Sequence, residues 1–469
     1  MDAALRELWE AIEAGDVLLA EARTGMLLAL PRMARATRSE AEDFIVSLIS
    51  NAARHEPMSE AAAFCRLLMS LGSASVKKMA SGALRELTSD GAYPPGWVTD
   101  IGKPVPGEAW RRHDVFGDDE AIIVTFSYGE NRHAVYVLLD MAMLPVATTV
   151  VVSQDPDELI EGMCSDDEPF WRWEQLSLAE ARRHLEAPLT RAAHGVASDL
   201  SNTSLTFLPV ARAHLKRLPA QDAPGAAAYT AADRAAAVED FLRGEQAAQA
   251  PDPAVARFWA QALTGYSGRV PGEPPAQVGP RKLAAMLGHV ANSFTLTDAQ
   301  RSGLRPAVTA WTGWAAGHQG LDDDAAAHLM ASLPKALDDF DAMYDDPQAA
   351  VARAYLRDVA ASDTDVTVLA EHVTRRSVAV PFPEMRDNGA SPMDVSDPSD
   401  RAAMVAADFA DCNLDDGMTR EDLIAEATRV TEELWAGEPA ATWEAARRMI
   451  LEEGKRRHDV IHALLNQPR

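Results

Sequence analysis

The hydrophobic period of this chain changes between residues 121 and 154, and that change sets the fold class. Three runs in this region are rich in β-branched and aromatic residues, and short turn-like segments separate them. Runs of this length and composition are typical of β-strands, so they predict an antiparallel meander of three strands. The runs are AIIVTFSYG (121–129), RHAVYVLLD (132–140) and VATTVVVSQ (146–154).

Helical patterns follow the meander and complete an α+β module. Asp155 and Pro156 have the residue types of a helix cap and a first helical position. The segment FWRWEQL (170–176) is a candidate further strand, and residues 177–195 return to helical spacing. A small sheet with helices on one face is the arrangement that this order favours.

The rest of the chain predicts helices, because alanine is the best helix former and dominates the apolar residues. The sequence therefore predicts a mainly α protein, a helical bundle or solenoid-like, with one small α+β module. The expected division is a helical domain (1–90), a Pro- and Gly-rich linker (91–106), the α+β module (107–200), a second helical domain (201–377), an irregular loop (378–401) and a helical tail (402–469).

The charge balance restricts the partners of this protein. It carries 71 acidic and 44 basic side chains, a formal net charge of −27. Such a surface repels phosphate backbones, so general nucleic-acid binding is disfavoured, although a local basic patch remains compatible with it. The same charge favours a protein partner, and a basic one in particular.

The sequence predicts a cytoplasmic protein that does not enter a membrane. Its three cysteines are far apart and form neither a disulfide framework nor a CxxC metal motif. The acidic, amphipathic N-terminus is unlike a signal peptide. Residues 133–152 are long enough to span a bilayer. However, His133, Asp140 and Pro145 interrupt this stretch, and two strands explain it better.

The segment RRHDVIHALL (456–465) contains a candidate metal site. His458 and His462 are four residues apart, which is the spacing that lets one helix present two ligands to a metal. A carboxylate from the preceding helix would add a ligand for zinc or another divalent metal. The candidates there are Glu426, Glu432 and, as our choice, Glu433. The alternative is a pair of histidines at the edge of a packed helix.

The segment DCNLDDGMTRED (411–422) resembles a calcium-binding loop. Oxygen-bearing side chains occupy its positions 1, 3, 5, 9 and 12, namely Asp411, Asn413, Asp415, Thr419 and Asp422. Two features depart from the rule, because Gly417 comes one place late and position 12 is Asp where Glu is usual. An acidic turn that caps a helix would produce the same pattern.

The predicted sheet contains polar residues but no complete catalytic set. His133 and Asp140 face opposite sides of their strand by alternation, so they do not form a dyad. Asp140 is most simply a turn residue, and Gly117, Asp118 and Asp119 a hairpin or bulge. The sequence contains no nucleophile elbow, P-loop or dinucleotide fingerprint. Trp311 and Trp314 are expected to be core residues.

Two segments resemble known protein families. WEAARRMILEEGKRRHDVIHAL (443–464) resembles the C-terminal signature of small bacterial helical domains of unknown function. The matching positions are Trp443, Ala446, Arg447, Arg448, Gly454, Arg457, His458 and His462. In that family an earlier helix often carries another His, whereas residues 421–434 carry none here. The meander resembles a module of large uncharacterised actinobacterial proteins. Neither resemblance implies an established activity.

These observations predict a cytosolic interaction or scaffold protein without catalytic chemistry, because no set of catalytic residue types converges in the sequence. One alternative is a metal-dependent hydrolase or a metal-stabilised domain that uses His458 and His462. A further alternative is an acidic antagonist of a basic protein.

Overall fold

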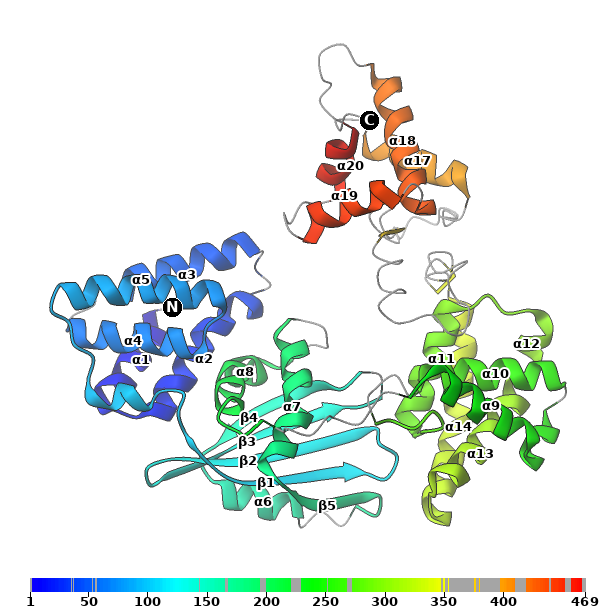
Figure 1. The fold of residues 1–469 in the computed structure, drawn as a ribbon, viewed down its shortest axis with the longest axis horizontal. Helices are drawn as coiled ribbons and strands as arrows, with labels where there is room; N and C mark the ends of the chain where they lie inside the picture. The colour runs from blue at the N-terminus through cyan, green and yellow to red at the C-terminus, as the bar shows by residue number, and fades with distance from the viewer. Residues whose placement is uncertain are drawn as a thin grey trace.

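The chain is mainly α-helical with one five-stranded antiparallel sheet, as the sequence predicts (Figure 1). The computed structural model describes residues 2–34, 36, 38–52, 54, 57–142, 144–164, 168–194, 200–220, 229–250, 252–267, 272–346, 349–350, 353, 375–376, 379, 397–409, 419–437, 440–451 and 457–465. In these ranges, no helix has the length and apolar character that crossing a bilayer requires.

Five helices form the N-terminal part and pack around one apolar core that includes Leu8, Leu27, Leu48 and Phe64. They are α1 (Asp2–Ala14), α2 (Val17–Met33), α3 (Arg38–Ala52), α4 (Met58–Leu71) and α5 (Ala74–Ser89). Side-chain caps start two of them, because Asp16 accepts the Leu19 N–H of α2 and Ser73 accepts the Val76 N–H of α5.

The predicted linker (91–106) is a packed part of the structure. It contains a short 3₁₀ helix, η1 (Gly96–Asp100), and its Val98 and Ile101 are buried in the N-terminal core. The first strand begins at Val105, inside the predicted linker. Proline and glycine interrupt the helical pattern here, but the apolar residues between them still anchor the segment.

The sheet has five strands in the order β4-β3-β2-β1-β5, and all neighbours are antiparallel. The strands are β1 (Val105–Asp114), β2 (Asp119–Tyr128), β3 (Asn131–Asp140), β4 (Val146–Ser153) and β5 (Trp171–Leu176). The predicted meander and the candidate strand at 170–176 are confirmed. Strand β1 was not predicted, because its sequence VPGEAWRRHD is polar and contains both Pro and Gly.

Helices α7 (Leu178–Ala193) and α8 (Asn202–Leu215) share one apolar core with the sheet. Leu205, Leu208 and Leu218 belong to this core, which therefore extends past residue 200, the predicted end of the α+β module. Helical spacing alone does not say against which module a helix packs.

Helix α6 (Pro156–Cys164) begins as predicted, with the Glu158 N–H bound to the Asp155 carboxylate at 2.9 Å.

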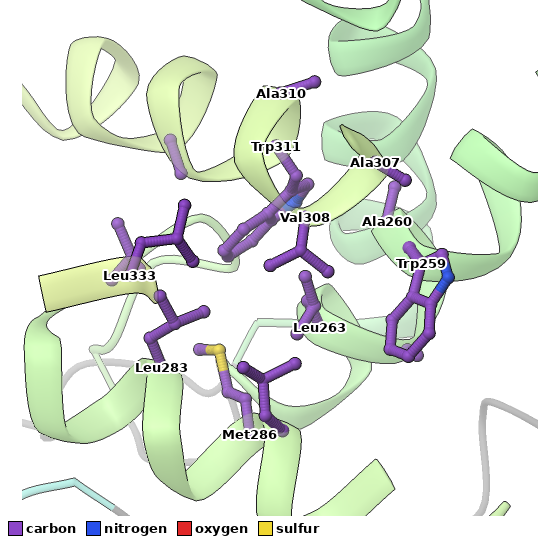
Figure 2. Packing of buried hydrophobic residues seen from close by; sticks show 14 of the residues in the cluster. Trp259, Ala260, Leu263, Leu283, Met286, Ala307, Val308, Ala310, Trp311 and Leu333 are labelled. Atoms are coloured by element: carbon purple, nitrogen blue, oxygen red, sulfur yellow. The ribbon is translucent and has the colours of Figure 1, made fainter. Parts of the chain in front are cut away.

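The second helical domain has its own core (Figure 2). Its elements are α9 (Ala231–Arg243), η2 (Glu245–Gln249), α10 (Pro253–Tyr266), α11 (Pro280–Ser293), α12 (Asp298–Ser302), α13 (Leu304–Gln319) and α14 (Asp323–Tyr344). Trp311 is fully buried and Trp314 nearly so, which confirms both as core residues. Figure 2 shows Trp311 and Val308 of α13 near Leu283 and Met286 of α11.

The C-terminal tail forms a small helical cluster around Phe409, Leu434, Val460 and Ile461. Its helices are α17 (Pro398–Asp408), α18 (Arg420–Ala436), α19 (Ala440–Leu451) and α20 (Arg457–Leu465). Most of the predicted irregular loop (378–401) lies outside the described residues. Its last residues begin α17, because the Asp397 side chain caps that helix at the Ser399 N–H.

Candidate functional site

The backbone of α20 carries both histidines of the predicted metal site. His458 and His462 lie one turn apart on this helix, and α20 contacts α18, which carries Glu433. The two histidine side chains lie outside the described part of the structure. The Glu433 carboxylate already accepts hydrogen bonds from Arg429 and from the Thr442 hydroxyl. The metal site therefore stays a prediction, and a metal would compete with these bonds for Glu433.

The calcium-like segment is only partly described. Asp411, Asn413, Asp415 and Gly417 lie outside the described residues. Thr419 and Asp422 form the capping box of α18, in which the Thr419 hydroxyl accepts the Asp422 N–H at 3.1 Å and donates to its carboxylate at 2.6 Å. These two residues thus act as a helix cap. Within the described ranges, no group of three or more His, Cys, Asp or Glu residues is placed to hold a metal ion.

A buried polar cluster, here called the inner seam, joins the N-terminal helices to the α+β module. It consists of Glu21 on α2, Tyr128 on β2, His133 on β3 and His214 on α8. Glu21 accepts hydrogen bonds from the His214 ring at 2.8 Å, the Tyr128 hydroxyl at 2.9 Å and the Gly102 N–H at 2.8 Å. The remaining ring nitrogen of His214 lies 3.4 Å from His133 Nε2.

Enclosure determines the charge of the inner seam. Glu21, His133 and His214 are completely buried. Burial, together with the nearby His214, lowers the pKa of His133 to about 3, so this ring is neutral at physiological pH. Burial and the Glu21 carboxylate raise the pKa of Tyr128, so its hydroxyl stays a donor. The residue types resemble a catalytic set, but their enclosure leaves no room for a substrate.

A second polar contact, here called the outer seam, joins the sheet to the second helical domain. It consists of Asp118, Asp119 and Asp140 at one end of the sheet and the N-terminus of α11 with Arg281. The Asp118 carboxylate accepts the Arg281 N–H at 2.6 Å and the Lys282 N–H at 3.0 Å. It therefore caps a helix that begins 162 residues further along the chain.

The arginine side chain of the outer seam binds two further carboxylates. The Arg281 guanidinium pairs with both Asp119 and Asp140. Asp140 also accepts the Ala142 N–H at 2.8 Å, so its predicted role as a turn residue is confirmed. Burial, together with the nearby Asp114, raises the pKa of Asp118 to about 6, although the backbone bonds oppose this shift. The outer seam thus depends on an acid that titrates just below neutral pH.

A cavity of about 610 Å³ lies beside the inner seam and is here called the basic pocket. Five cationic side chains line it, and they come from four parts of the fold: Arg66 of α4, Lys77 of α5, Lys103 after η1, and Lys216 and Arg217 at the end of α8. The packed segment 94–103 forms one wall. Gly102 connects the pocket to the inner seam, because it lines the cavity and donates its N–H to Glu21.

The cations of the basic pocket lack ion-pair partners among the described acidic residues. Among the residues that the structure describes, none of the five forms an ion pair with a carboxylate. Burial, followed by the neighbouring charges of Lys77 and Arg212, lowers the pKa of Lys216. Uncompensated positive charge is unusual in a chain with a net charge of −27. The basic pocket therefore concentrates positive charge, which attracts anions in general.

No protein-family model, curated protein or solved structure matches this chain. The candidate sites therefore rest on the geometry of the chain itself.

Only indirect signals for these sites are present in the sequence. His133 was singled out and its face correctly predicted, since it stacks on Phe126 with the apolar side of the sheet. The GDD turn was predicted as a turn but not as a helix cap for another domain. The basic pocket was missed, because its cations are spread from residue 66 to residue 217 and form no basic run.

Proposed function

We propose that this chain is a non-catalytic interaction protein that recognises an anionic group through the basic pocket. The observation that carries the proposal is the set of five cations around one cavity without an acidic partner among the described residues. Cations that stabilise a fold are usually paired with carboxylates, and this acidic chain has many available. Keeping five unpaired around a cavity favours a ligand that supplies the negative charge.

The buried residues support the non-catalytic part of the proposal. Glu21, His133 and His214 are residue types that perform acid–base chemistry, yet all three are enclosed and bind one another. A general acid or base must come within hydrogen-bond reach of its substrate. The inner seam is therefore best explained as a structural contact that holds two modules together. It also positions Gly102, which lines the basic pocket.

Calorimetric titration of the full chain with pyrophosphate tests this function. Wild type is expected to bind one equivalent at low ionic strength, and the Lys77→Met/Lys216→Met double variant to lose about tenfold or more in affinity. Lys78→Met is the matched control, because Lys78 is the exposed neighbour of Lys77 and does not line the cavity. Absence of saturable binding, or an equal loss in the control, would refute the proposal.

A metal-stabilised tail, with hydrolytic chemistry as its extension, is the second candidate function. It is favoured by the placement of His458 and His462 one turn apart on α20, next to the helix of Glu433. Elemental analysis of the untagged protein tests it directly. One equivalent of zinc or another divalent metal that disappears in His458→Ala/His462→Ala would support the site, and metal-free wild type would exclude it.

A further inference from the structure

We infer that the basic pocket takes a small molecule that carries two or more phosphoryl groups and a planar ring, as a nucleoside di- or triphosphate does. This inference rests on the proposed function and specifies its ligand. It depends on the distribution of the cations, the size of the cavity and one exposed aromatic side chain.

The distribution of the cations favours an extended anion. Arg66, Lys77 and Lys103 approach from three separate elements, and Lys216 and Arg217 approach from a fourth. A single phosphate carries at most two negative charges near neutral pH and bonds to a few donors at one point. A chain of phosphoryl groups carries more charge and extends far enough to meet cations on several walls.

Helix stabilisation explains only part of this charge. Lys216 and Arg217 follow the last turn of α8, where cations favourably oppose the partial negative charge of the helix end. The same reasoning does not apply to Arg66 inside α4, to Lys77 near the start of α5, or to Lys103 outside any helix. These three cations converge on the pocket without a helix-terminal role.

The cavity is larger than an isolated phosphate requires. Its volume of about 610 Å³ falls within the usual range of sites for organic ligands. Its walls are not uniformly charged, because Met69, Val98 and Ile101 add apolar surface, and Pro94 and Pro95 add a stiff wall. A ligand that fills this space has an uncharged organic part beside its phosphoryl groups.

An exposed aromatic side chain precedes the proline wall. Tyr93 is 75% exposed and comes directly before Pro94, which lines the cavity. Of the large apolar and aromatic side chains that the structure describes as exposed, Tyr93 is the most exposed. Tyr93 is not itself among the residues that line the cavity, but an exposed aromatic ring next to a lining residue is able to stack on a planar ring. We assign the ring of the ligand to Tyr93 and the phosphoryl groups to the cations.

A set of calorimetric titrations tests the ligand class. The probes are ATP, ADP, pyrophosphate, inorganic phosphate, citrate and adenosine, each titrated into the full chain at one ionic strength. We expect ATP and ADP to bind about tenfold or more tightly than phosphate, citrate or adenosine, because only they satisfy both parts of the pocket.

Two variants separate the two parts of the site. Lys77→Met/Lys216→Met is expected to weaken ATP and pyrophosphate alike, whereas Tyr93→Ala is expected to weaken ATP by roughly fivefold or more and to leave pyrophosphate unchanged. Thermal melting checks that both variants fold. Lys216→Met is expected to fold, because it removes a charge that burial and like-charged neighbours oppose.

The outcomes distinguish this inference from the proposed function. If phosphate or citrate binds as tightly as ATP, or if Tyr93→Ala leaves ATP binding unchanged, the inferred ligand class is wrong while an anion site remains. If adenosine binds as tightly as ATP, the phosphoryl assignment is wrong. If no probe binds, or if the lysine variant binds pyrophosphate as wild type does, both the inference and the proposed function fail. An acidic peptide that displaces ATP and binds more tightly would also overturn the inference.

Discussion

The inner and outer seams each join two modules, and they do so with different chemistry. In the inner seam, Glu21, His133 and His214 are completely buried. Their hydrogen bonds are therefore shielded from water. The outer seam combines the buried Asp118 with ion pairs near the surface, where the Arg281 side chain is 48% exposed. The first junction should therefore resist salt and moderate pH changes, whereas the second should respond to both.

Each seam also requires a glycine, and for the same steric reason. A Cβ at Gly25 of α2 would lie 2.3 Å from the Thr206 carbonyl oxygen of α8. A Cβ at Gly279, just before α11, would lie 2.5 Å from both carboxylate oxygens of Asp118. In both places the absent side chain allows one module to approach the other. The seams therefore differ in electrostatics but share the requirement for close contact.

The largest expected effect comes from breaking the inner seam at its carboxylate. Glu21→Ala leaves the His214 ring, the Tyr128 hydroxyl and the Gly102 N–H without their acceptor. We expect a loss of about 3–5 kcal/mol in the free energy of unfolding, measured by denaturant titration. Glu13→Ala on the exposed face of α1 is the control. A loss below about 1 kcal/mol would show that the inner seam does not fasten the modules.

The next effect is a pH dependence that belongs to the outer seam. The pKa of Asp118 is raised from 3.8 to about 6 in the folded protein, so the folded state holds its proton more tightly than the unfolded state. Its stabilising contribution is therefore complete below about pH 4 and is lost as the pH rises through about 6. Over this window we expect wild type to lose about 3 kcal/mol relative to Asp118→Asn.

Denaturant titrations of both proteins between pH 4 and 7 measure this difference. The other acids titrate in both proteins, so their contribution cancels in the comparison. Parallel pH profiles would contradict the raised pKa. If wild type instead gains stability over Asp118→Asn as the pH rises, the pKa of Asp118 is lowered in the folded protein. The backbone hydrogen bonds of Asp118 would then affect its pKa more than its burial does.

A smaller effect is expected from the glycine of the outer seam. Gly279→Ala forces the added Cβ against the Asp118 carboxylate, and we expect a cost of about 1–3 kcal/mol. The Arg281 and Lys282 N–H groups donate to the Asp118 carboxylate. Faster hydrogen exchange at these two amides would show that the loss of stability arises at this contact. Gly313→Ala on α13 is the control, because a Cβ there meets no atom within 4 Å. Unchanged exchange at both amides would contradict the assigned contact.

The smallest effect is expected from the exposed ion pairs of the outer seam. Arg281→Met removes the pairs with Asp119 and Asp140 but keeps the backbone N–H that Asp118 accepts. Exposed ion pairs contribute little, so we expect a loss of about 0.5–1 kcal/mol that decreases as salt is added. A loss as large as that of Glu21→Ala would mean that the two seams are not different in kind.

The sequence predicted the elements of this fold better than their assembly. The β-branched runs at 121–154 identified β2, β3 and β4, and Asp155 identified the start of α6, because strand period and helix caps are local properties. Strand β1 escaped prediction because only its pairing with β2 and β5 makes a polar segment extended. The sequence placed α8 after the α+β module although its apolar residues pack in the core of the sheet, because helical spacing does not indicate a packing partner.

The sites were harder to predict for the same reason. His133 could be placed on the correct face by alternation, but its partners Glu21 and His214 lie 112 and 81 residues away in the sequence. The cations of the basic pocket are single residues in separate helices and in the segment after η1. Only the folded arrangement brings such residues together, whereas the tail histidines share one helix and are visible in the sequence.

Hydrogen exchange of the full chain with and without saturating pyrophosphate tests the central claim most directly, because it reads the pocket and both seams in one experiment. The account predicts slower exchange at residues 96–103 and 213–217, which line the basic pocket, and unchanged exchange at Arg281 and Lys282 of the outer seam. Unchanged exchange at the pocket, or equal slowing throughout the chain, would contradict an anion site at this place.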